Sequence, residues 1–477
     1  MPIQERRARA FVEALNAGDA DGYEAFMQEN RSSAGLASGT PQERAASYQN
    51  IRNLLGDINV VEFNLKDDTH SEIIVEDDHG ERIIISLEHD PEEVYRIGSI
   101  GIESAGAAAG RNSNMPAVTI PPEWATLDDL LTSYQTQSGV PAWAAAVIRD
   151  GKIVDQAVAG QLSISNNTPV SLDSRFHWGS VTKSVTGTVI GKLVEDGILE
   201  WDAKIGEILS DIPMRDAYRN VTIAQLMAHA GGIPTYTMFD DAGVERLRGY
   251  TGSSTERREA FVADVLQEQP VGQPGLSSMY SNAGITIAGL MAERVSGKSW
   301  EDLVRDLVFV PAGMTEARFG WPATSKTPDQ PQGHFGPPGG LQPMPVDYMS
   351  PTQPTLAPAG NVQSSIGDFA RYALMHLKGL AGEDGPLQAK TIQYLHSRQP
   401  FGGEPGGGYY AFGWSVSVAP DGAEQHRHNG SAGSYYAEIR LYPEQNMGIV
   451  LLANVGGGYA RPLSEPLFMT IRRKFSE

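Results

Sequence analysis

Strand-forming segments occur at both ends of the region after residue 120, and mostly helical sequence lies between them. Near its start, segments 142–148 and 153–159 flank Asp150 and Gly151, a dipeptide typical of tight hairpins. Four more segments with strand character lie towards the C-terminus, at 412–418, 424–428, 435–442 and 448–454. We therefore expect an α/β (α+β) domain over 120–477, with an antiparallel sheet built from both ends, flanking helices and a helical subdomain.

The first hundred residues show helices first and strands afterwards. Residues 11–19 form a helical pattern that ends at a glycine, and further helical pieces are expected around Tyr23 and over 43–55. Four strand segments follow, at 60–66, 72–76, 82–88 and 94–103. This order predicts a small α+β domain over 1–103, joined to the larger domain by a flexible linker over 104–119. Its first helix pair resembles NTF2-like (SnoaL-like) cone-shaped domains, so we expect an accessory domain through which the chain could form a homo-oligomer.

A serine and a lysine stand three residues apart at the start of a strongly apolar helical pattern. Ser180 and Lys183 belong to a segment whose apolar residues recur at helical spacing, namely Val181, Val185, Val189, Ile190, Leu193 and Val194. Positions three apart share one face of a helix, so the hydroxyl and the amine can meet near the positive end of the helix dipole. Because a serine hydroxyl needs a base before it can attack a carbonyl, the pair is a candidate for nucleophilic catalysis.

An S-x-x-K pattern by itself is most often an ordinary exposed helix start. In this chain two further short motifs follow it in order, Y-S-N at 280–282 and H-N-G at 428–430. The three together resemble the serine β-lactamase and penicillin-binding-protein superfamily, specifically its class C-like branch, which carries S-x-x-K, Y-x-N and then K-T-G or H-x-G. Segments 226–234 and 428–455 also resemble parts of that family, so the resemblance extends over about 124–471.

The resemblance implies a role for each residue of these motifs. Ser180 would attack the substrate carbonyl and form an acyl-enzyme, with Lys183 as its partner. Tyr280 would act as the base, which requires a nearby cation such as Lys183, because an unperturbed phenol has a pKa of about 10. The residues expected to bind or orient the substrate are Asn282, His428, Gly430 and Ser431.

These four residues are expected to act in different ways. Asn282 would donate from its amide to the substrate and accept from Lys183. Gly430 would let the substrate approach the strand closely, because it has no side chain. By the same resemblance, the backbone N–H groups of Ser180 and Ser431 would form the oxyanion hole.

His428 is a departure from the class C β-lactamases, which have lysine at this place. Histidine occurs there in several DD-peptidases, D-aminopeptidases and esterases of the same fold. The change removes a permanent positive charge, and we expect activity to become pH-dependent through the histidine itself. His229 and His334 begin the same H-x-G pattern, but only His428 precedes the expected pair of strands.

Composition and motif searches exclude several other classes of protein. The formal net charge of −21 and the pI of about 4.9 argue against a nucleic-acid partner. The chain has no cysteine and no H-E-x-x-H motif, and we expect neither a metal nor another cofactor. It has no G-x-S-x-G motif either, so the nucleophile turn of an α/β-hydrolase is unsupported. No apolar run is long enough for a membrane span, and the first residues lack the apolar core of a signal peptide. The compartment is left open, although relatives of the family are often exported.

Taken together, the sequence predicts a serine hydrolase that acts through an acyl-enzyme on Ser180. The expected substrates are small esters, or amides and peptides with a D-configured residue. A β-lactamase is the alternative within the fold. The alternative that is not a hydrolase is a penicillin-binding sensor, in which Ser180 becomes acylated but water cannot release the acyl group. Residues 321–358 are rich in proline and glycine, so we expect there a long ordered loop without packed elements beside the site.

Overall fold

The computed structural model of the chain describes residues 1–17, 19–37, 41, 44, 48, 57–77, 82–104, 115–116, 118–120, 124–237, 241–275, 278–325, 328–346, 354–400, 408–419 and 422–476. The chain divides into two compact units, Met1–Ser113 with Val271–Gln273, and Asn114–Pro270 with Pro274–Glu477. The helix expected over 43–55 and the linker expected over 104–119 lie for the most part outside the described residues.

The first unit begins with helices and ends with an antiparallel sheet in the order β1-β2-β3-β4. Its elements are α1 (Ile3–Asn16), α2 (Ala20–Asn30), α3 (Ser33–Ala37), β1 (Ile58–Leu65), β2 (His70–Asp77), β3 (Arg82–Asp90) and β4 (Arg96–Ser104). Phe11 of α1 packs in one core with Ile73 and Ile85 of the sheet. All four segments predicted as strands form strands, whereas the NTF2-like resemblance of this unit stays a prediction.

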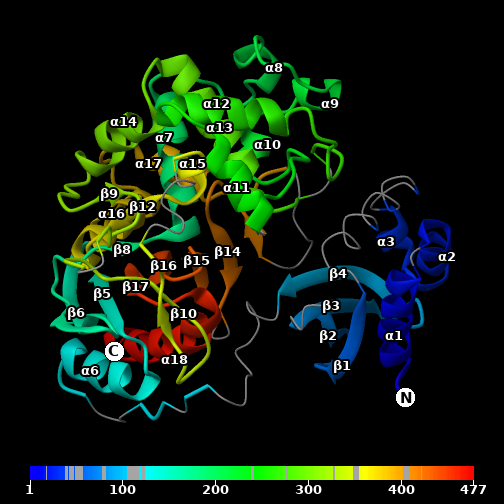
Figure 1. The fold of residues 1–477 in the computed structure, drawn as a ribbon, viewed down its shortest axis with the longest axis horizontal. Helices are drawn as coiled ribbons and strands as arrows, with labels where there is room; N and C mark the ends of the chain where they lie inside the picture. The colour runs from blue at the N-terminus through cyan, green and yellow to red at the C-terminus, as the bar shows by residue number, and fades with distance from the viewer. Residues whose placement is uncertain are drawn as a thin grey trace. The chain divides into compact units, whose positions relative to one another are not determined.

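The second unit is organised on an eight-stranded antiparallel sheet in the order β13-β14-β15-β16-β17-β5-β6-β7 (Figure 1). Its strands are β5 (Ala142–Arg149), β6 (Lys152–Ser163), β7 (Asn166–Pro169), β13 (Tyr409–Tyr410), β14 (Ser415–Val418), β15 (Glu424–Ser431), β16 (Tyr436–Tyr442) and β17 (Met447–Ala453). β5 pairs directly with β17, for example Ala145 with Leu451. The prediction of one sheet built from both ends of this region is therefore confirmed.

The hairpin between β5 and β6 forms where the sequence predicts it. Asp150 and Gly151 both adopt positive φ angles, 50° and 73°. Two successive residues with positive φ form the turn whose twist matches that of the flanking strands, which explains the preference for Asp-Gly.

Helices cover both faces of this sheet. Alternate residues of β5 divide between two cores: Trp143 and Ala145 pack with α6 (Leu127–Ser138) and α18 (Gly457–Ser476). Ala144 and Ala146 belong to the core that contains residues of α7 (Thr182–Glu195) and α16 (Ile366–Leu380). Because a strand directs successive side chains to opposite faces, β5 is buried on both sides.

A helical subdomain and short strands complete the second unit. Its helices are α8 (Ile205–Ile208), α9 (Asp216–Arg219), α10 (Ile223–Met227), α11 (Asp241–Gly249), α12 (Ser254–Val265), α13 (Asn282–Ser296) and α14 (Trp300–Val304), followed by a π-helix at Arg305–Phe309. Between this subdomain and the large sheet, β8 (Phe176–His177), β12 (Val362–Ser364) and β9 (Arg318–Phe319) form a small sheet. α17 (Ala389–Leu395) packs with α7 and α16.

α16 begins at Ile366, because Ser365 caps it and the preceding residues pair as β12. One expectation from the sequence is wrong. The proline-rich segment 321–358, expected to contain no packed element, holds a short hairpin of β10 (His334–Phe335) and β11 (Gln342–Pro343) and the start of α15 (Ala357–Gly360). Residues 326–327 and 347–353 of that segment lie outside the described residues.

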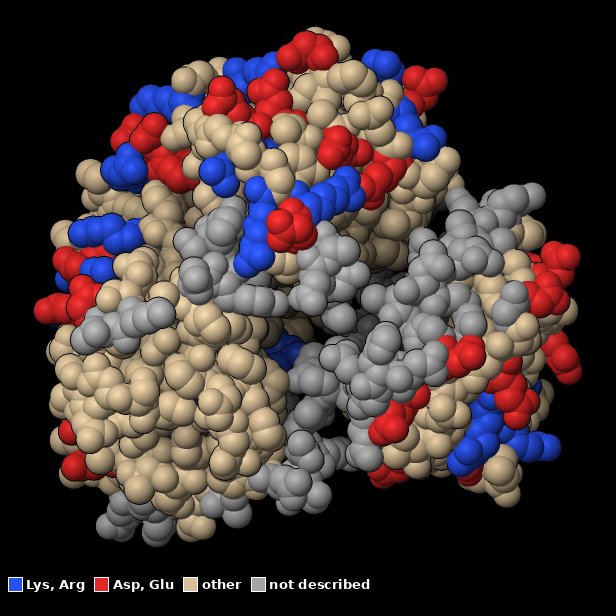
Figure 2. Space-filling view, viewed as in Figure 1, with Lys and Arg blue, Asp and Glu red and all other residues tan. Residues whose placement is uncertain are grey.

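The charges on the visible face of the helical subdomain have mixed sign. Figure 2 shows acidic and basic side chains interspersed there, with no continuous basic surface on the face that is drawn. None of the helices in the described part of the chain combines the length and the apolar character that crossing a membrane requires.

Candidate active site

Ser180 lies in a single 3-10 turn, Gly179–Val181, that leads from β8 into α7. The turn is fixed by side chains of the following helix: Ser184 Oγ donates to the Val181 carbonyl (2.7 Å), and Thr182 Oγ1 accepts from the backbone N–H of Val362 (3.1 Å). Ser180 is half-buried and stands at the positive end of α7, as the sequence predicts.

Lys183 is buried completely and faces Ser180. Its Nζ donates to Ser180 Oγ at 3.0 Å and to the backbone carbonyl of Ala359 at 2.8 Å. Among the described residues, no carboxylate makes an ion pair with this amine. Burial lowers the pKa of Lys183 well below its ordinary value of 10.5. A neutral amine within hydrogen-bond distance of the serine hydroxyl can accept its proton.

Tyr280 lies next to this pair, with its ring centroid 4.7 Å from Lys183 Nζ. Tyr280 exposes 36% of its surface. The protein around its phenol nevertheless removes much of the water there, and this desolvation raises the pKa of the phenol well above 10. A hydrogen bond with Ser180 lowers that pKa, but by less. The phenolate base that the sequence predicts is therefore disfavoured, and Lys183 is the better proton acceptor of the two.

Asn282 is the first residue of α13, two positions after Tyr280, and it does not accept a hydrogen bond from Lys183 as expected. Its Nδ2 donates to the Tyr236 carbonyl at 2.7 Å, which ties the helix start to the loop after α10. Its Oδ1 is buried and has no hydrogen-bond partner among the described residues. The Lys183 amine is instead engaged by Ser180 and Ala359.

His428 uses both of its ring nitrogens within the protein. Nδ1 lies 2.7 Å from the Asn429 carbonyl, which can only accept, so Nδ1 carries the hydrogen. Nε2, 3.0 Å from the Tyr410 hydroxyl, therefore accepts from it. Burial lowers the pKa of His428 to about 3, so the ring is neutral at physiological pH. This argues against the expected pH-dependence through the histidine.

Gly430 lies against the nucleophile turn. A Cβ at this position would lie 2.0 Å from the Trp178 carbonyl oxygen and 2.5 Å from the Ser180 nitrogen. A Cβ at Gly179, which adopts a φ of 51°, would in turn lie 2.7 Å from the Ser431 nitrogen. The two glycines thus let β15 and the turn approach each other, whereas the sequence reasoning assigned Gly430 to the approach of a substrate.

Ser431 is held at the end of β15 by its side chain. Its Oγ accepts from the backbone N–H groups of Gly457 (2.9 Å) and Gly433 (3.3 Å). Its own backbone nitrogen faces Gly179, beside Ser180. The predicted oxyanion hole of Ser180 and Ser431 is compatible with this arrangement and stays a prediction.

Sequence reasoning missed two aromatic residues of the site. Tyr410, on β13, bonds to His428 as described above, and no motif marks it. His229 had been considered only as another match to H-x-G, but its ring centroid lies 4.4 Å from that of Tyr280 and 4.6 Å from that of Tyr410. The structure therefore brings Ser180, Lys183 and Tyr280 together beside Gly430, Ser431 and His428 and adds these two, whereas the contact of Asn282 is with Tyr236.

Comparisons with known proteins agree with this geometry. A family model described as Beta-lactamase matches residues 127–469. The chain is 30% identical over 344 residues to penicillin-binding protein 4 of Amycolatopsis lactamdurans, which covers 70% of this chain and 86% of that protein. It is 27% identical over 304 residues to the unguisins hydrolase ungD' of Aspergillus campestris, which covers 60% of this chain and 54% of that protein.

Solved structures give the same result for the fold. The octameric penicillin-binding protein homologue from Pyrococcus abyssi matches with a TM-score of 0.58 and 26% identity, over 71% of this chain and 75% of that one. A D-stereospecific amidohydrolase from Streptomyces sp. matches with a TM-score of 0.56 and 20% identity, over 70% of this chain and 95% of that one. At this identity the second match shows the fold alone.

Proposed function

Because the chain belongs to the β-lactamase family, we propose that it is a serine hydrolase of esters and D-amino-acid amides or peptides, with Ser180 as the nucleophile. The preferred substrates carry no carboxylate close to the scissile bond. That the chain is a serine hydrolase of this superfamily follows from its membership of the family. The substrate class rests on the neutral His428 and is the part that needs testing.

The geometry supports a two-step reaction with Lys183 as the proton carrier. In the first step, the proton of Ser180 Oγ passes to the neutral Nζ of Lys183, and Oγ forms a bond to the substrate carbonyl carbon. The negative charge on the carbonyl oxygen is stabilised by the N–H groups of Ser180 and Ser431. The bond to the leaving group then breaks, and the leaving group takes the proton from Lys183, directly or through the Tyr280 hydroxyl.

The second step repeats the first with water. A water molecule transfers a proton to Lys183 and attacks the acyl carbon, and the bond to Ser180 Oγ breaks. The oxygen of Ser180 takes this proton back from Lys183, so that both groups return to their starting state, and the acid is released. Tyr280 serves throughout as a neutral phenol, because burial raises its pKa.

The observation that carries the substrate class is the hydrogen bond between Tyr410 and His428. It holds an uncharged imidazole where class C β-lactamases are expected to carry a lysine. A substrate carboxylate there would lose its water without gaining a cation, which is costly. Neutral esters and amides do not incur this cost. The curated relative named as an unguisins hydrolase is compatible with such a substrate range.

A second candidate is acylation by penicillins. It is favoured by the relative of 30% identity that is named a penicillin-binding protein. The two candidates differ in the compound that reacts with Ser180, since benzylpenicillin carries a carboxylate and p-nitrophenyl acetate does not.

Two measurements separate these candidates, each with Ser180→Ala in parallel: turnover of p-nitrophenyl acetate and of D-alanyl amides, and intact-protein mass after mixing with benzylpenicillin. We expect both substrates to be hydrolysed by the wild type and not by Ser180→Ala, and little adduct to form with benzylpenicillin. A stable or rapidly turned-over penicillin adduct would favour the second candidate. Full activity of Ser180→Ala would contradict the mechanism as a whole.

We also propose that the chain forms a homo-oligomer through residues 1–103. A solved structure to which the chain is similar is named as octameric, which supports this proposal. Light scattering of the full chain would give its mass in solution, and cross-linking would show whether residues 1–103 lie at the interface. A monomeric mass would contradict this proposal.

A further inference from the structure

We propose that His229 is a positioning residue that holds the Tyr280 phenol in place beside Ser180 and Lys183. This inference rests on the proposed function, because it concerns the same active site. It does not give His229 a chemical step of its own. The proposal is that one imidazole, on the loop after α10, determines where the Tyr280 phenol lies.

His229 contacts three consecutive residues with Tyr280 in the middle. Its backbone carbonyl accepts from the N–H of Met279 at 2.8 Å. Its Nδ1 accepts from the N–H of Ser281 at 3.2 Å. Its ring packs against the Tyr280 ring, with centroids 4.4 Å apart and planes inclined by 45°. Tyr280 is thus fixed on both sides along the backbone and through its side chain by a single residue.

The hydrogen bond to Ser281 also decides the protonation of the imidazole. Since a backbone N–H can only donate, Nδ1 accepts and the hydrogen lies on Nε2. Nε2 is buried and has no partner among the described residues. Burial lowers the pKa of His229 well below 6.5, so the ring stays neutral. The residue therefore carries an unpaired buried donor within the active site, which is an unfavourable arrangement.

The backbone of His229 is strained as well. Its φ is 58°, in the left-handed region that glycine adopts freely and other residues adopt at a cost. The conformation is held by hydrogen bonds from the N–H of His229 to Leu226 (3.0 Å) and from the N–H of Ala230 to Gln225 (2.7 Å). It lets both the carbonyl and the imidazole of His229 reach the segment of Tyr280. A glycine would relieve the strain but would keep only the carbonyl contact.

The imidazole also packs against Tyr410. The two ring centroids lie 4.6 Å apart, and the Tyr410 hydroxyl donates to His428. His229 therefore contacts both the loop that carries Tyr280 and the strand that carries Tyr410. A shift of this ring would move Tyr280 away from Lys183, whose amine lies 4.7 Å from the Tyr280 ring centroid.

The test compares two substitutions that each keep half of the interactions. His229→Asn retains a side-chain acceptor for Ser281 and tolerates a positive φ, but it has no ring. His229→Phe retains the ring but has no acceptor. In both we expect kcat for p-nitrophenyl acetate to fall by about 10-fold to 100-fold through misplacement of Tyr280, with KM changed by less than about threefold. The control is His376→Asn, a buried histidine on α16 that bonds to Thr188 and His396, with unchanged kcat.

Two further readouts exclude a merely structural role. A displaced Tyr280 would admit water to Lys183, so the pKa of Lys183 would rise and the acid limb of the kcat/KM profile would move to higher pH. In a Tyr280→Phe background, His229→Phe should have little additional effect on kcat, because both changes remove the same function. Unchanged kcat and acid limb in both His229 variants, or effects that add fully to that of Tyr280→Phe, would overturn the proposal.

The labelling of Ser180 by a fluorophosphonate separates this inference from the proposed function. The wild-type protein should be labelled, Ser180→Ala should not, and both His229 variants should be labelled more slowly than the wild type. Absence of wild-type labelling would overturn the proposed function together with this inference. Normal labelling rates in both folded His229 variants would overturn the inference alone.

Discussion

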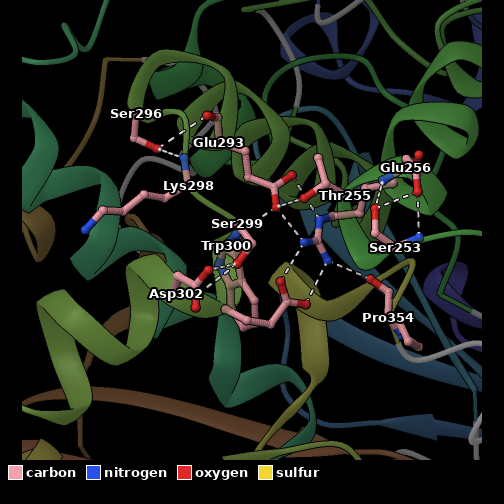
Figure 3. Close-up of polar contacts among 12 residues, drawn as sticks. Ser253, Thr255, Glu256, Glu293, Ser296, Lys298, Ser299, Trp300, Asp302 and Pro354 are labelled. Carbon is pink, nitrogen blue, oxygen red and sulfur yellow. Dashed lines mark hydrogen bonds and ion pairs between the residues drawn. The ribbon is translucent and has the colours of Figure 1, made fainter.

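Two cations in the second unit, Lys183 and Arg258, are both completely buried, and the protein treats them in opposite ways. Arg258 on α12 makes ion pairs with Glu293 (2.6 Å) and Glu301 (2.7 Å) and donates to the Pro354 carbonyl (2.7 Å). Figure 3 shows Glu293 and Pro354 within this network of polar contacts. Among the described residues, the hydrogen-bond partners of Lys183 are a hydroxyl and a backbone carbonyl.

The difference appears in the direction of the two pKa shifts. Hydrogen bonds with Glu293 and Glu301 outweigh burial and raise the pKa of Arg258, so it stays charged and joins α12, α13 and α14. Burial lowers the pKa of Lys183, and no carboxylate in the described part of the chain compensates for it. A buried cation with compensating charges supports the structure, whereas one without them can lose its proton and act as a base.

The largest effect should come from Lys183→Met, which removes the proton acceptor and keeps a side chain of similar length. We expect kcat/KM to fall by about 10³-fold to 10⁴-fold, with no loss of thermal stability, because an uncompensated buried amine disappears. Turnover of p-nitrophenyl acetate and a thermal melt measure the two effects. The control is Lys192→Met on the same helix, where the lysine is paired with Glu195 and Asp196 near the surface. A Lys183→Met variant with near wild-type turnover would show that Lys183 is not the base, and its contrast with the structural Arg258 would be lost.

Arg258→Met should give the opposite result, a large loss of stability. The substitution leaves the buried Glu293 and the partly buried Glu301 without a cation, so we expect the free energy of unfolding to fall by about 3–5 kcal/mol. Denaturant unfolding measures this change. Arg294→Met is the matched control, because Arg294 is partly exposed and pairs with Asp211 and Glu259, and its loss should cost less than about 1 kcal/mol. Equal losses of unfolding free energy in the two variants would show that the buried ion pairs of Arg258 stabilise the protein no more than the partly exposed ones of Arg294.

The pKa of Lys183 also predicts how stability depends on pH. Between the lowered pKa of the folded state and 10.5, the unfolded chain binds one more proton at this lysine than the folded chain does. The contribution of Lys183 to the free energy of unfolding therefore rises with pH in that window, by up to about 1.4 kcal/mol per pH unit, and declines as pH falls. Unfolding free energies at several pH values, wild type minus Lys183→Met, isolate this slope. A flat difference would mean that Lys183 stays charged in the folded protein.

The smallest effect is expected at His428, where the site lacks a permanent cation. His428→Lys should speed acylation of Ser180 by benzylpenicillin by about tenfold, since a carboxylate would gain a partner. His428→Gln is the neutral control and should not increase that rate. Stopped-flow mixing followed by mass spectrometry gives both rates. If the lysine variant is no faster than the glutamine variant, charge at this position does not decide the choice of substrate.

Much of the fold and of the site could be predicted from local patterns. The Asp150-Gly151 hairpin, the strands at both ends of the second unit and the helix that starts at Ser180 all follow from short-range periodicity and turn chemistry. The motifs also identified residues that lie together, since Ser180, Tyr280 and Gly430 meet at one turn. Tyr410 and His229 were missed as members of the site, because their contacts with His428 and Tyr280 connect segments far apart in the chain.

The sequence by itself determined which groups are available: a hydroxyl at 180, an amine at 183, a phenol at 280 and an imidazole at 428. Only the tertiary structure decided their protonation and partners. The Ala359 carbonyl that receives Lys183 lies 176 residues further along the chain, and the Tyr410 hydroxyl is what holds His428 as an acceptor. A pKa depends on the water and charge that folding removes or brings near, so the same motif can hold a cation or a base according to what surrounds it.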